Sequence, residues 1–428
     1  MARHATDDMV GPHPAQEVDD AAPERAARCP MSLAGSRVGL DLTDELGRLR
    51  DSGHRPRVTT AFGQEAIMLS RYAEVRAQLA DTHGFHVGPV PPPPALVDAG
   101  LDPARVRRRM VGNLVRMDPP HHTRLRRMVT AWFTSRRVER MRPRVVEIIN
   151  AALDAMEQAG PPVDLVSMFA RTVPVMVICE LIGVPEDDRE GFRRRASGTT
   201  DRATPLDELR RLGEASWVSH ELIAHHREHP SDDVIGMLLR EHGAGSAAND
   251  ITDDELVGLA NALLIAGHET TTQMLALGTL ALLRHPDQLA MVRDDPAVVP
   301  GAVEELLRYV GVLHGGFIRV ATRDTTIGGH QIRAGELVVP ALAAANRDPQ
   351  LVEDGDRLDV TRPPTSHVAF GHGIHFCIGA PLARMELREA FPALLDRFPN
   401  LRLAVPESEL EFTDNTMVYA LRSMPVTW

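Results

Sequence analysis

The chain has 428 residues, of which 43% are hydrophobic and 25% are charged, and its formal net charge is −12. The acidic balance argues against a nucleic-acid-binding protein, three cysteines are too few for a disulfide framework, and no run of about 18 apolar residues is present to span a membrane. We therefore expect a cytoplasmic protein of ordinary globular composition, without an internal repeat.

The first part of the chain divides into three stretches. Residues 1–30 mix charged residues, proline and alanine without periodicity, so we expect a disordered tail before a single domain over 31–428. From about residue 55 to 80, short β-branched segments precede the helical run YAEVRAQLAD, which predicts a hairpin followed by a helix. The proline run within 86–100 excludes a helix or a central strand and predicts a surface connection.

Helical patterns dominate from about residue 119 to 293, and the longest begins with the capping-box pattern Thr252-x-x-Glu255. Apolar residues then recur at i+3 and i+4 as far as Arg284, and Pro286 ends the pattern. The 33 residues from Thr252 to Arg284 would form a helix about 50 Å long, which must cross the whole domain.

Short hairpins are predicted beyond residue 310 by glycine-rich segments such as TTIGGHQIRAGELVVP, and a final helix by the residues after Cys377. Helices are therefore numerous and strands are few and short. The sequence predicts a mainly α protein with a small β part, of the α+β class.

Cys377 has unusual neighbours for an isolated cysteine. It lies in VAFGHGIHFCIGAPLARME, residues 368–386, whereas Cys179 lies in an apolar run and is expected to be an inert core thiol, and Cys29 belongs to the tail. The glycines around Cys377 allow the backbone to curl around the sulfur and to direct N–H groups at a thiolate. These glycines are Gly371, Gly373 and Gly379.

The pattern Phe370-Gly371-x-Gly373-x-His375-x-Cys377-x-Gly379 resembles the haem-binding loop of cytochrome P-450, the haem-thiolate monooxygenases. The resemblance runs from about residue 58 to the C-terminus. It implies the cytochrome P-450 fold with the long helix over haem b, Cys377 as the iron ligand, and Phe370 and Gly379 as residues that contact the cofactor.

The same resemblance requires a small-residue break followed by an acid and a threonine in the long helix. The sequence there reads Ala266-Gly267-His268-Glu269-Thr270. Small residues at 266 and 267 would let the flat macrocycle and O2 approach the backbone, so Ala266 is expected to contact the cofactor. Glu269 and Thr270 would be the catalytic residues that deliver protons.

Two further sets of residues match the family. Glu305 and Arg308 would form a buried pair that braces the core behind the cysteine loop. Cations are also required for the two haem propionates, which the resemblance assigns to His122, Arg126, Arg319 and His375.

The resemblance implies a monooxygenase that inserts one atom of O2 into a hydrophobic small molecule by hydroxylation or epoxidation. Electrons would come from NAD(P)H through a ferredoxin reductase and a ferredoxin, because no flavin or iron–sulfur segment is present. We expect a monomer that acts on a macrolide-like or polyketide-like compound. The ferredoxin would meet a local basic patch, which is compatible with the negative net charge. That patch would consist of Arg124, Arg127, Arg136, Arg384 and Arg388.

The substrate pocket is expected, by analogy with the family, to be walled by five stretches of the chain. These are residues 86–112, about 165–225, 262–270, 310–317 and 415–418. The low aromatic content, 4%, favours an aliphatic pocket.

Several alternatives stay open at this point. The substrate could be a terpenoid, a steroid, an amino acid or a molecule tethered to a carrier protein, and the chain could instead use peroxide, sense a haem ligand or assist another enzyme. The pattern His225-x-x-Glu228-His229 fits a zinc motif, yet Pro230 ends its helix and no third ligand is evident.

Overall fold

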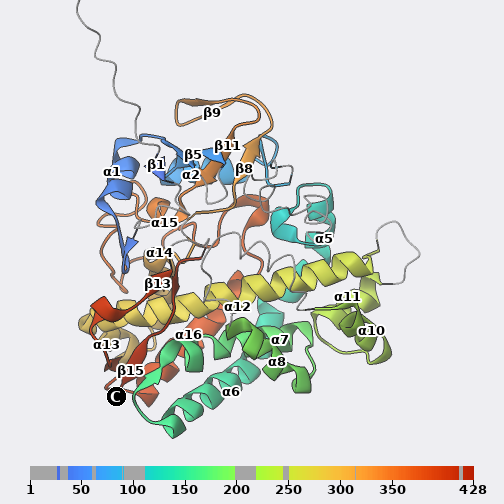
Figure 1. Cartoon of the computed structure of the whole chain (residues 1–428), viewed down its shortest axis with the longest axis vertical. Coiled ribbons are helices and arrows are strands. Elements are labelled where there is room, and N and C mark those ends of the chain that lie inside the picture. Colours follow the sequence, from blue (N-terminus) through green and yellow to red (C-terminus); the bar gives the residue numbers. More distant parts are fainter. Residues whose placement is uncertain are drawn as a thin grey trace, which may run out of the picture.

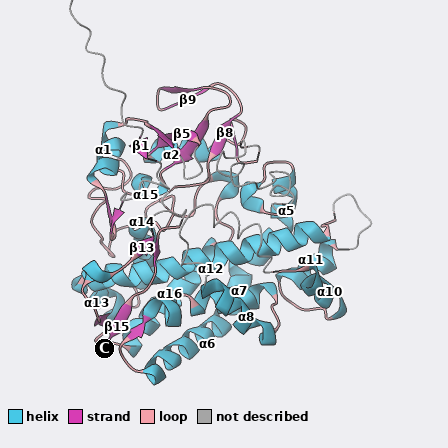
Figure 2. Ribbon diagram, in the orientation of Figure 1, coloured by secondary structure: helices cyan, strands magenta, loops and turns pink. Residues whose placement is uncertain are grey.

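Helices make up most of the computed structural model, in which residues 27–28, 37–59, 64–88, 90, 111–197, 218–243, 250–313, 315–413 and 418–428 are described (Figure 2). This confirms the mainly α class. The helices longer than one turn among these residues are α1 (Asp44–Ser52), α2 (Tyr72–Ala80), α5 (His121–Thr130), α6 (Ser135–Ala159), α7 (Thr172–Ile182), α8 (Glu186–Ser197), α10 (His220–Glu228), α11 (Val234–His242), α12 (Asp253–Arg284), α13 (Pro286–Asp294), α14 (Val299–Val310), α15 (Leu342–Ala345) and α16 (Ala380–Arg397).

Helix α12 is the axis of the fold and runs across the middle of Figure 1. The predicted capping box is confirmed, because the Glu255 N–H donates to Thr252 Oγ1 at 3.2 Å and the Thr252 N–H donates to Glu255 Oε2 at 3.0 Å. Every residue from 271 to 282 is buried, as expected of a helix surrounded by other helices. Its neighbours are α7, α14 and α16, and α16 in turn packs against α6.

The strands form one larger sheet and several small ones. The larger sheet has the order β1-β4-β5-β11-β8-β6, with β1 parallel to β4, β5 parallel to β11 and the other pairs antiparallel. It lies above α12 in Figure 1, beside α1 and α2. The strands are β1 (Ala27–Arg28), β2 (Arg37–Val38), β3 (Asp41–Leu42), β4 (Arg57–Thr59), β5 (Glu65–Leu69), β6 (Phe85–His86), β7 (Val163–Asp164), β8 (Arg319–Ala321), β9 (Thr325–Ile327), β10 (His330–Ile332), β11 (Leu337–Pro340), β12 (Arg402–Leu403), β13 (Phe412–Thr413), β14 (Ala420–Leu421) and β15 (Pro425–Thr427).

The predicted elements of the first hundred residues have mixed outcomes. The hairpin and helix expected between 55 and 80 are confirmed as β4, β5 and α2. Two residues assigned to the tail, Ala27 and Arg28, form β1 and pair with β4, so ordered structure begins within the predicted tail. The rest of the tail, and most of the 86–100 connection, lie outside the described residues.

Glu305 and Arg308 form the expected buried pair on α14. Their side chains are 3% and 0% exposed, and both guanidinium–carboxylate distances are 2.7 Å. Glu305 has a third partner that was not anticipated: Arg362 Nε donates to Glu305 Oε1 at 3.2 Å. Arg308 additionally donates to the carbonyl oxygens of Asn346 and Gly355, so this cluster joins α14 to the segment that leads to the cysteine loop.

None of the helices that the structure describes is both long enough and apolar enough to cross a membrane.

Candidate functional site

The cysteine loop is a tight turn that ends at α16. The Cys377 N–H donates to the Phe370 carbonyl oxygen at 2.9 Å, which closes the loop, and the 3-10 helix η4 (Gly373–His375) lies between them. Gly371 and Gly373 adopt φ angles of 71° and 72°, as predicted for glycines that let the chain curl. Gly379 differs, since its φ is −80° and it is the N-cap of α16. A Cβ at 379 would lie 3.9 Å from the Cys377 sulfur.

Cys377 is partly buried, and the backbone N–H groups of Gly379 and Ala380 lie close enough to its thiol to favour the ionised form. Burial raises the pKa of the thiol, while these two N–H groups and the charges of Arg126 and Arg384 oppose that effect. The sulfur therefore lies in a desolvated position that already contains donors directed at a negative charge. These are the features that the sequence analysis required of a thiolate ligand.

The four basic residues assigned to the propionates lie close together, although they come from α5, β8 and the cysteine loop. The rings of His122 and His375 have their centroids 4.5 Å apart, and Arg126 Nη2 donates to the Phe376 carbonyl oxygen at 2.7 Å. Arg319 reaches the Leu79 carbonyl oxygen at 3.4 Å.

This basic cluster is electrostatically unfavourable by itself. Burial, followed by the charges of His122, Arg319 and Arg126, lowers the pKa of His375 to about 3, and burial lowers the pKa of Arg319 to about 10. The opposing acid is Asp118, whose carboxylate accepts the N–H groups of residues 87 and 88. The cluster thus concentrates basic groups that repel one another.

Unpartnered nitrogen atoms also indicate that the basic cluster lacks negatively charged partners. Within the part of the chain that the structure describes, both ring nitrogens of His122 and Nε of Arg319 are buried without a hydrogen-bond partner, although the two residues are 2% and 3% exposed. Buried donors of this kind carry a desolvation cost unless a ligand accepts from them. A ligand that carries carboxylates would satisfy them. Haem has two propionates, so the residues present fit a haem group next to the buried sulfur.

The middle of α12 presents the predicted small residue and threonine. Ala266 is exposed although Leu263, Leu264 and His268 around it are buried, and Thr270 Oγ1 donates to the Ala266 carbonyl oxygen at 2.8 Å. A Cβ at Gly267 would lie 2.9 Å from Cδ1 of Ile178, so this glycine has a packing role, and its expected approach to the cofactor stays a prediction. Gly267 allows α12 to pack against α7, and Ala266 alone keeps the exposed position.

Together, the mainly helical fold, the cysteine loop and the basic cluster fit the class of haem proteins expected from the sequence. The family model "Cytochrome P450" matches residues 218–426. The chain is 42% identical to cytochrome P450 165B3 of Amycolatopsis orientalis (93% of this chain, 99% of the relative) and 40% identical to the mycinamicin IV hydroxylase/epoxidase of Micromonospora griseorubida (91% and 96%). It also resembles a crystal structure of CYP105P1 in complex with filipin I (TM-score 0.83, 39% identity, 94% and 99% coverage).

The chain therefore belongs to the cytochrome P450 family, and it is a monooxygenase. The fold of this family is confirmed by the structural likeness. Membership implies haem as the cofactor, O2 and a small molecule as substrates, and redox proteins as electron donors.

The ferredoxin-facing arginines are only partly brought together. Arg124 forms an ion pair with Glu255 at the start of α12, and Arg384 forms one with Glu304, so both are engaged within the protein. Arg127 and Arg136 are exposed. These internal partners could not be predicted from the sequence, because each acid lies on a different helix from its arginine and far from it in the chain.

The expected substrate walls are described only in part. Leu313 and Val418 form an isolated β-bridge, which joins the 310–317 stretch to the end of the 415–418 stretch. Residues 91–110, 198–217, 314 and 415–417 of the expected walls lie outside the described residues.

Two other features lie apart from this site. The rings of His225 and His229 stack with centroids 4.5 Å apart, and no group of three or more metal-binding side chains is found where the structure is described.

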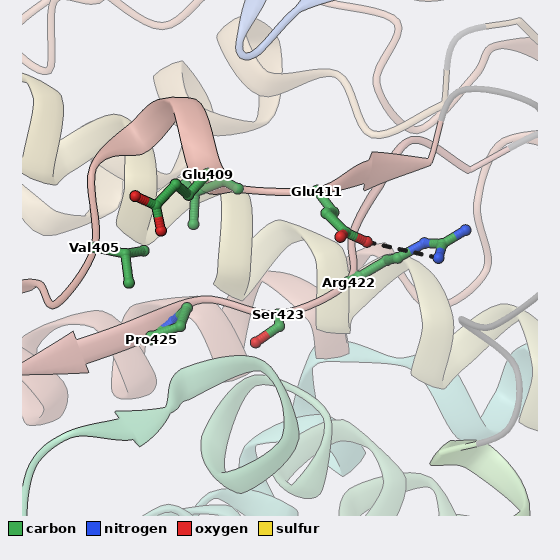
Figure 3. Close-up of a pocket in the computed structure, with 7 residues that line it drawn as sticks. Val405, Glu409, Glu411, Arg422, Ser423 and Pro425 are labelled. Carbon is green, nitrogen blue, oxygen red and sulfur yellow. Dashed lines mark ion pairs between the residues drawn. The ribbon is translucent and has the colours of Figure 1, made fainter.

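A pocket of about 230 Å3 is lined by Val405, Glu409, Leu410, Glu411, Arg422, Ser423 and Pro425. Figure 3 shows its Glu411–Arg422 ion pair, 3.7 Å long. Its lining contains none of the site residues predicted from the sequence.

Proposed function

We propose that Cys377 binds the iron of haem b as a thiolate. The observation that carries this assignment is the Cys377 thiol in its tight loop, beside a basic cluster in which the ring nitrogens of His122 and Nε of Arg319 lack acceptors among the described residues. Haem held by a thiolate supplies the activation of O2 and the transfer of one oxygen atom to substrate. The protein supplies the ligand, the charges that hold the propionates and a proton path.

The propionate contacts are assigned to the basic cluster of His122, Arg126, Arg319 and His375. The unpartnered nitrogens of His122 and Arg319 would donate to the carboxylates, which removes their desolvation cost. Phe370 and Gly379 would contact the macrocycle on the side of the sulfur, and Ala266 would contact it on the side of α12.

Glu269 and Thr270 are proposed to deliver protons. Both side chains are partly exposed, and the Thr270 hydroxyl is held by its bond to the Ala266 carbonyl oxygen. Rotation of this hydroxyl away from the carbonyl would let Thr270 donate its proton toward bound O2, and the carboxylate of Glu269 would take a proton from solvent and pass it to the Thr270 oxygen.

The substrate proposed is a macrolide-like or polyketide-like molecule that is hydroxylated or epoxidised in secondary metabolism. Support comes from the relative described as a mycinamicin IV hydroxylase/epoxidase and from the related structure in complex with filipin I. A carrier-bound substrate stays the second candidate, and the titration described below distinguishes the two.

The electron donor proposed is a ferredoxin, itself reduced from NAD(P)H by a ferredoxin reductase. Exposed Arg127 and Arg136 would contribute to its docking face. Arg124 and Arg384 leave this assignment because their charges are paired internally. A cytoplasmic location, a monomeric state and a single domain over 31–428 stay predictions.

The ligand assignment is tested by the carbon monoxide spectrum of the reduced protein. Cys377→Ser should lose the thiolate-type band, whereas Cys179→Ser, which changes a buried thiol on α7, should keep it. Retention of the band in Cys377→Ser would overturn the proposal. The substrate class is tested by titrating the ferric protein with free macrolides, terpenoids, steroids and amino acids. A saturable shift to high spin identifies the class, and no shift from any of them favours a carrier-bound substrate.

A further inference from the structure

Glu304, on α14, is a carboxylate with several basic partners beside the cysteine loop. Arg384 Nε and Nη2 donate to its two oxygens at 2.7 and 2.8 Å, His367 Nε2 lies 3.3 Å away and Arg388 Nη2 lies 3.7 Å away. Burial alone would raise the pKa of Glu304, but His367 and Arg384 lower it to about 2. Glu304 therefore stays ionised and holds the planar guanidinium of Arg384 by a bidentate contact.

The same guanidinium lies over an aromatic ring of the cysteine loop. Arg384 Cζ is 4.5 Å from the centroid of the Phe370 ring, a distance typical of a cation–π contact. The Phe370 carbonyl oxygen accepts the Cys377 N–H at 2.9 Å, and its ring meets the ring of Phe376 edge to face at 6.2 Å. A continuous set of contacts thus leads from Glu304 through Arg384 and Phe370 to the backbone of Cys377.

Arg384 also places a charge near the sulfur that pH cannot remove, because a guanidinium stays protonated in proteins. This charge lies beside the cysteine loop, because the Phe370 residue under the guanidinium is the one whose carbonyl oxygen accepts the Cys377 N–H. Arg388 lies one turn further along α16. It has the same charge and a longer contact with Glu304, and no stacking on Phe370 is found for it in the described structure.

We propose that Glu304 and Arg384 are positioning residues for the haem-thiolate centre. Glu304 fixes Arg384, and Arg384 holds the Phe370 ring against the cysteine loop and keeps a positive charge beside the thiolate. That charge favours the ferrous over the ferric state, because reduction adds a negative charge to the centre. The inference rests on the proposed ligation by Cys377.

The ferric–ferrous equilibrium of the haem-loaded protein tests this proposal. It is measured by spectroelectrochemical titration with dye mediators and without a donor protein, so docking does not enter. Arg384→Gln removes the charge but keeps an N–H donor for Glu304, and it should shift the equilibrium about tenfold toward the ferric state, equal to about 59 mV for one electron. Arg388→Gln, the matched control, should shift it less than about twofold.

A conservative variant separates position from charge. Arg384→Lys keeps the positive charge but loses the planar guanidinium. Its ferric–ferrous equilibrium constant should therefore stay within about twofold of that of the parent protein. The fraction of the reduced carbon monoxide complex with a thiolate-type band should fall, because Phe370 is held less firmly. This second readout also applies if the glutamine variant fails to take up haem.

An unchanged equilibrium in Arg384→Gln, or an equal shift in Arg388→Gln, would overturn the charge effect. An unchanged thiolate band in Arg384→Lys would overturn the positioning effect. Failure of the proposed function is recognised separately, because the parent protein would then lack the thiolate band.

Discussion

Removal of the Glu305 carboxylate should destabilise the protein much more than removal of an exposed carboxylate with the same geometry. The Glu305–Arg308 pair is bidentate, spans i,i+3 and is almost fully buried. Glu190 and Arg193 on α8 have the same spacing and contacts of 2.7 and 2.8 Å, but they are 50% and 42% exposed. The two pairs therefore share spacing and contact distances but differ in burial, and Glu305 also accepts from Arg362 and from the Asp359 N–H.

The expected magnitude follows from what each variant leaves behind. Glu305→Ala leaves the guanidinium of Arg308 buried without its carboxylate, which costs about 3–5 kcal/mol. It also removes the acceptor of the Asp359 N–H, 3.0 Å away, which adds about 1 kcal/mol. Glu190→Ala should cost about 0.2–1 kcal/mol, because water replaces the lost partner. The difference in the free energy of unfolding should therefore exceed about 2 kcal/mol.

The assay is urea unfolding of the haem-loaded protein, followed by far-UV circular dichroism and by haem absorbance. Coincidence of the two transitions checks that one cooperative step is being compared. Equal slopes on urea concentration would show that the variants expose the same surface on unfolding. The reasoning is refuted if the Glu305→Ala and Glu190→Ala proteins differ by less than about 1 kcal/mol.

Three further outcomes are expected. Thr270→Ala should still bind haem but should consume more NAD(P)H per product formed; an unchanged product yield would contradict the proton-relay role. Gly373→Ala should lower the melting temperature more than Gly371→Ala. Both glycines have a positive φ, but only a Cβ at 373 would clash, at 2.5 Å from a carbonyl oxygen of α2. Equal melting temperatures of the two variants would contradict this. His226 and Asp233 form a buried pair. Burial disfavours the charged form of each, but their hydrogen bond and opposite charges outweigh burial, so the pKa of His226 is raised and that of Asp233 is lowered. This pair should stabilise the fold most between about pH 4 and 6.5, and the stabilisation should be lost as pH rises through the raised pKa of His226. His226→Gln should therefore flatten the pH dependence of the unfolding free energy between about pH 6 and 8. Parallel pH profiles of the parent and the variant in that range would contradict the pair's contribution.

The parts of the fold that sequence reasoning predicted well are those governed by neighbours along the chain. Both ends of α12 were found because Thr252 and Glu255 cap each other locally and because Pro286 begins the next helix. The cysteine loop was found for the same reason, since the backbone conformations of Gly371 and Gly373 are local requirements. Local signals of this kind do not depend on knowing the tertiary structure.

The parts that were missed depend on contacts across the chain. Arg124 meets Glu255 over 131 residues and Arg384 meets Glu304 over 80, so nothing near either arginine shows that its charge is already paired. The packing of Gly267 against Ile178 of α7 was likewise not visible in its motif, because the two residues are far apart in the chain. Long-range pairing of this kind follows from the assembled fold and not from a local pattern.

The charges around the cysteine loop divide according to whether the protein supplies their partners. Arg308 and Arg384 each have a carboxylate held at hydrogen-bond distance, so these charges can stabilise the fold before any ligand binds. His122 and Arg319 are buried like Arg308, yet the described structure gives no acceptor to the ring nitrogens of His122 or to Nε of Arg319. Buried groups of this kind cost folding free energy, and the cost is offset only when an anion arrives. Anion binding is therefore coupled to folding at His122 and Arg319, where the requirements of binding lower the stability of the unliganded protein. At Arg308 and Arg384 there is no such conflict.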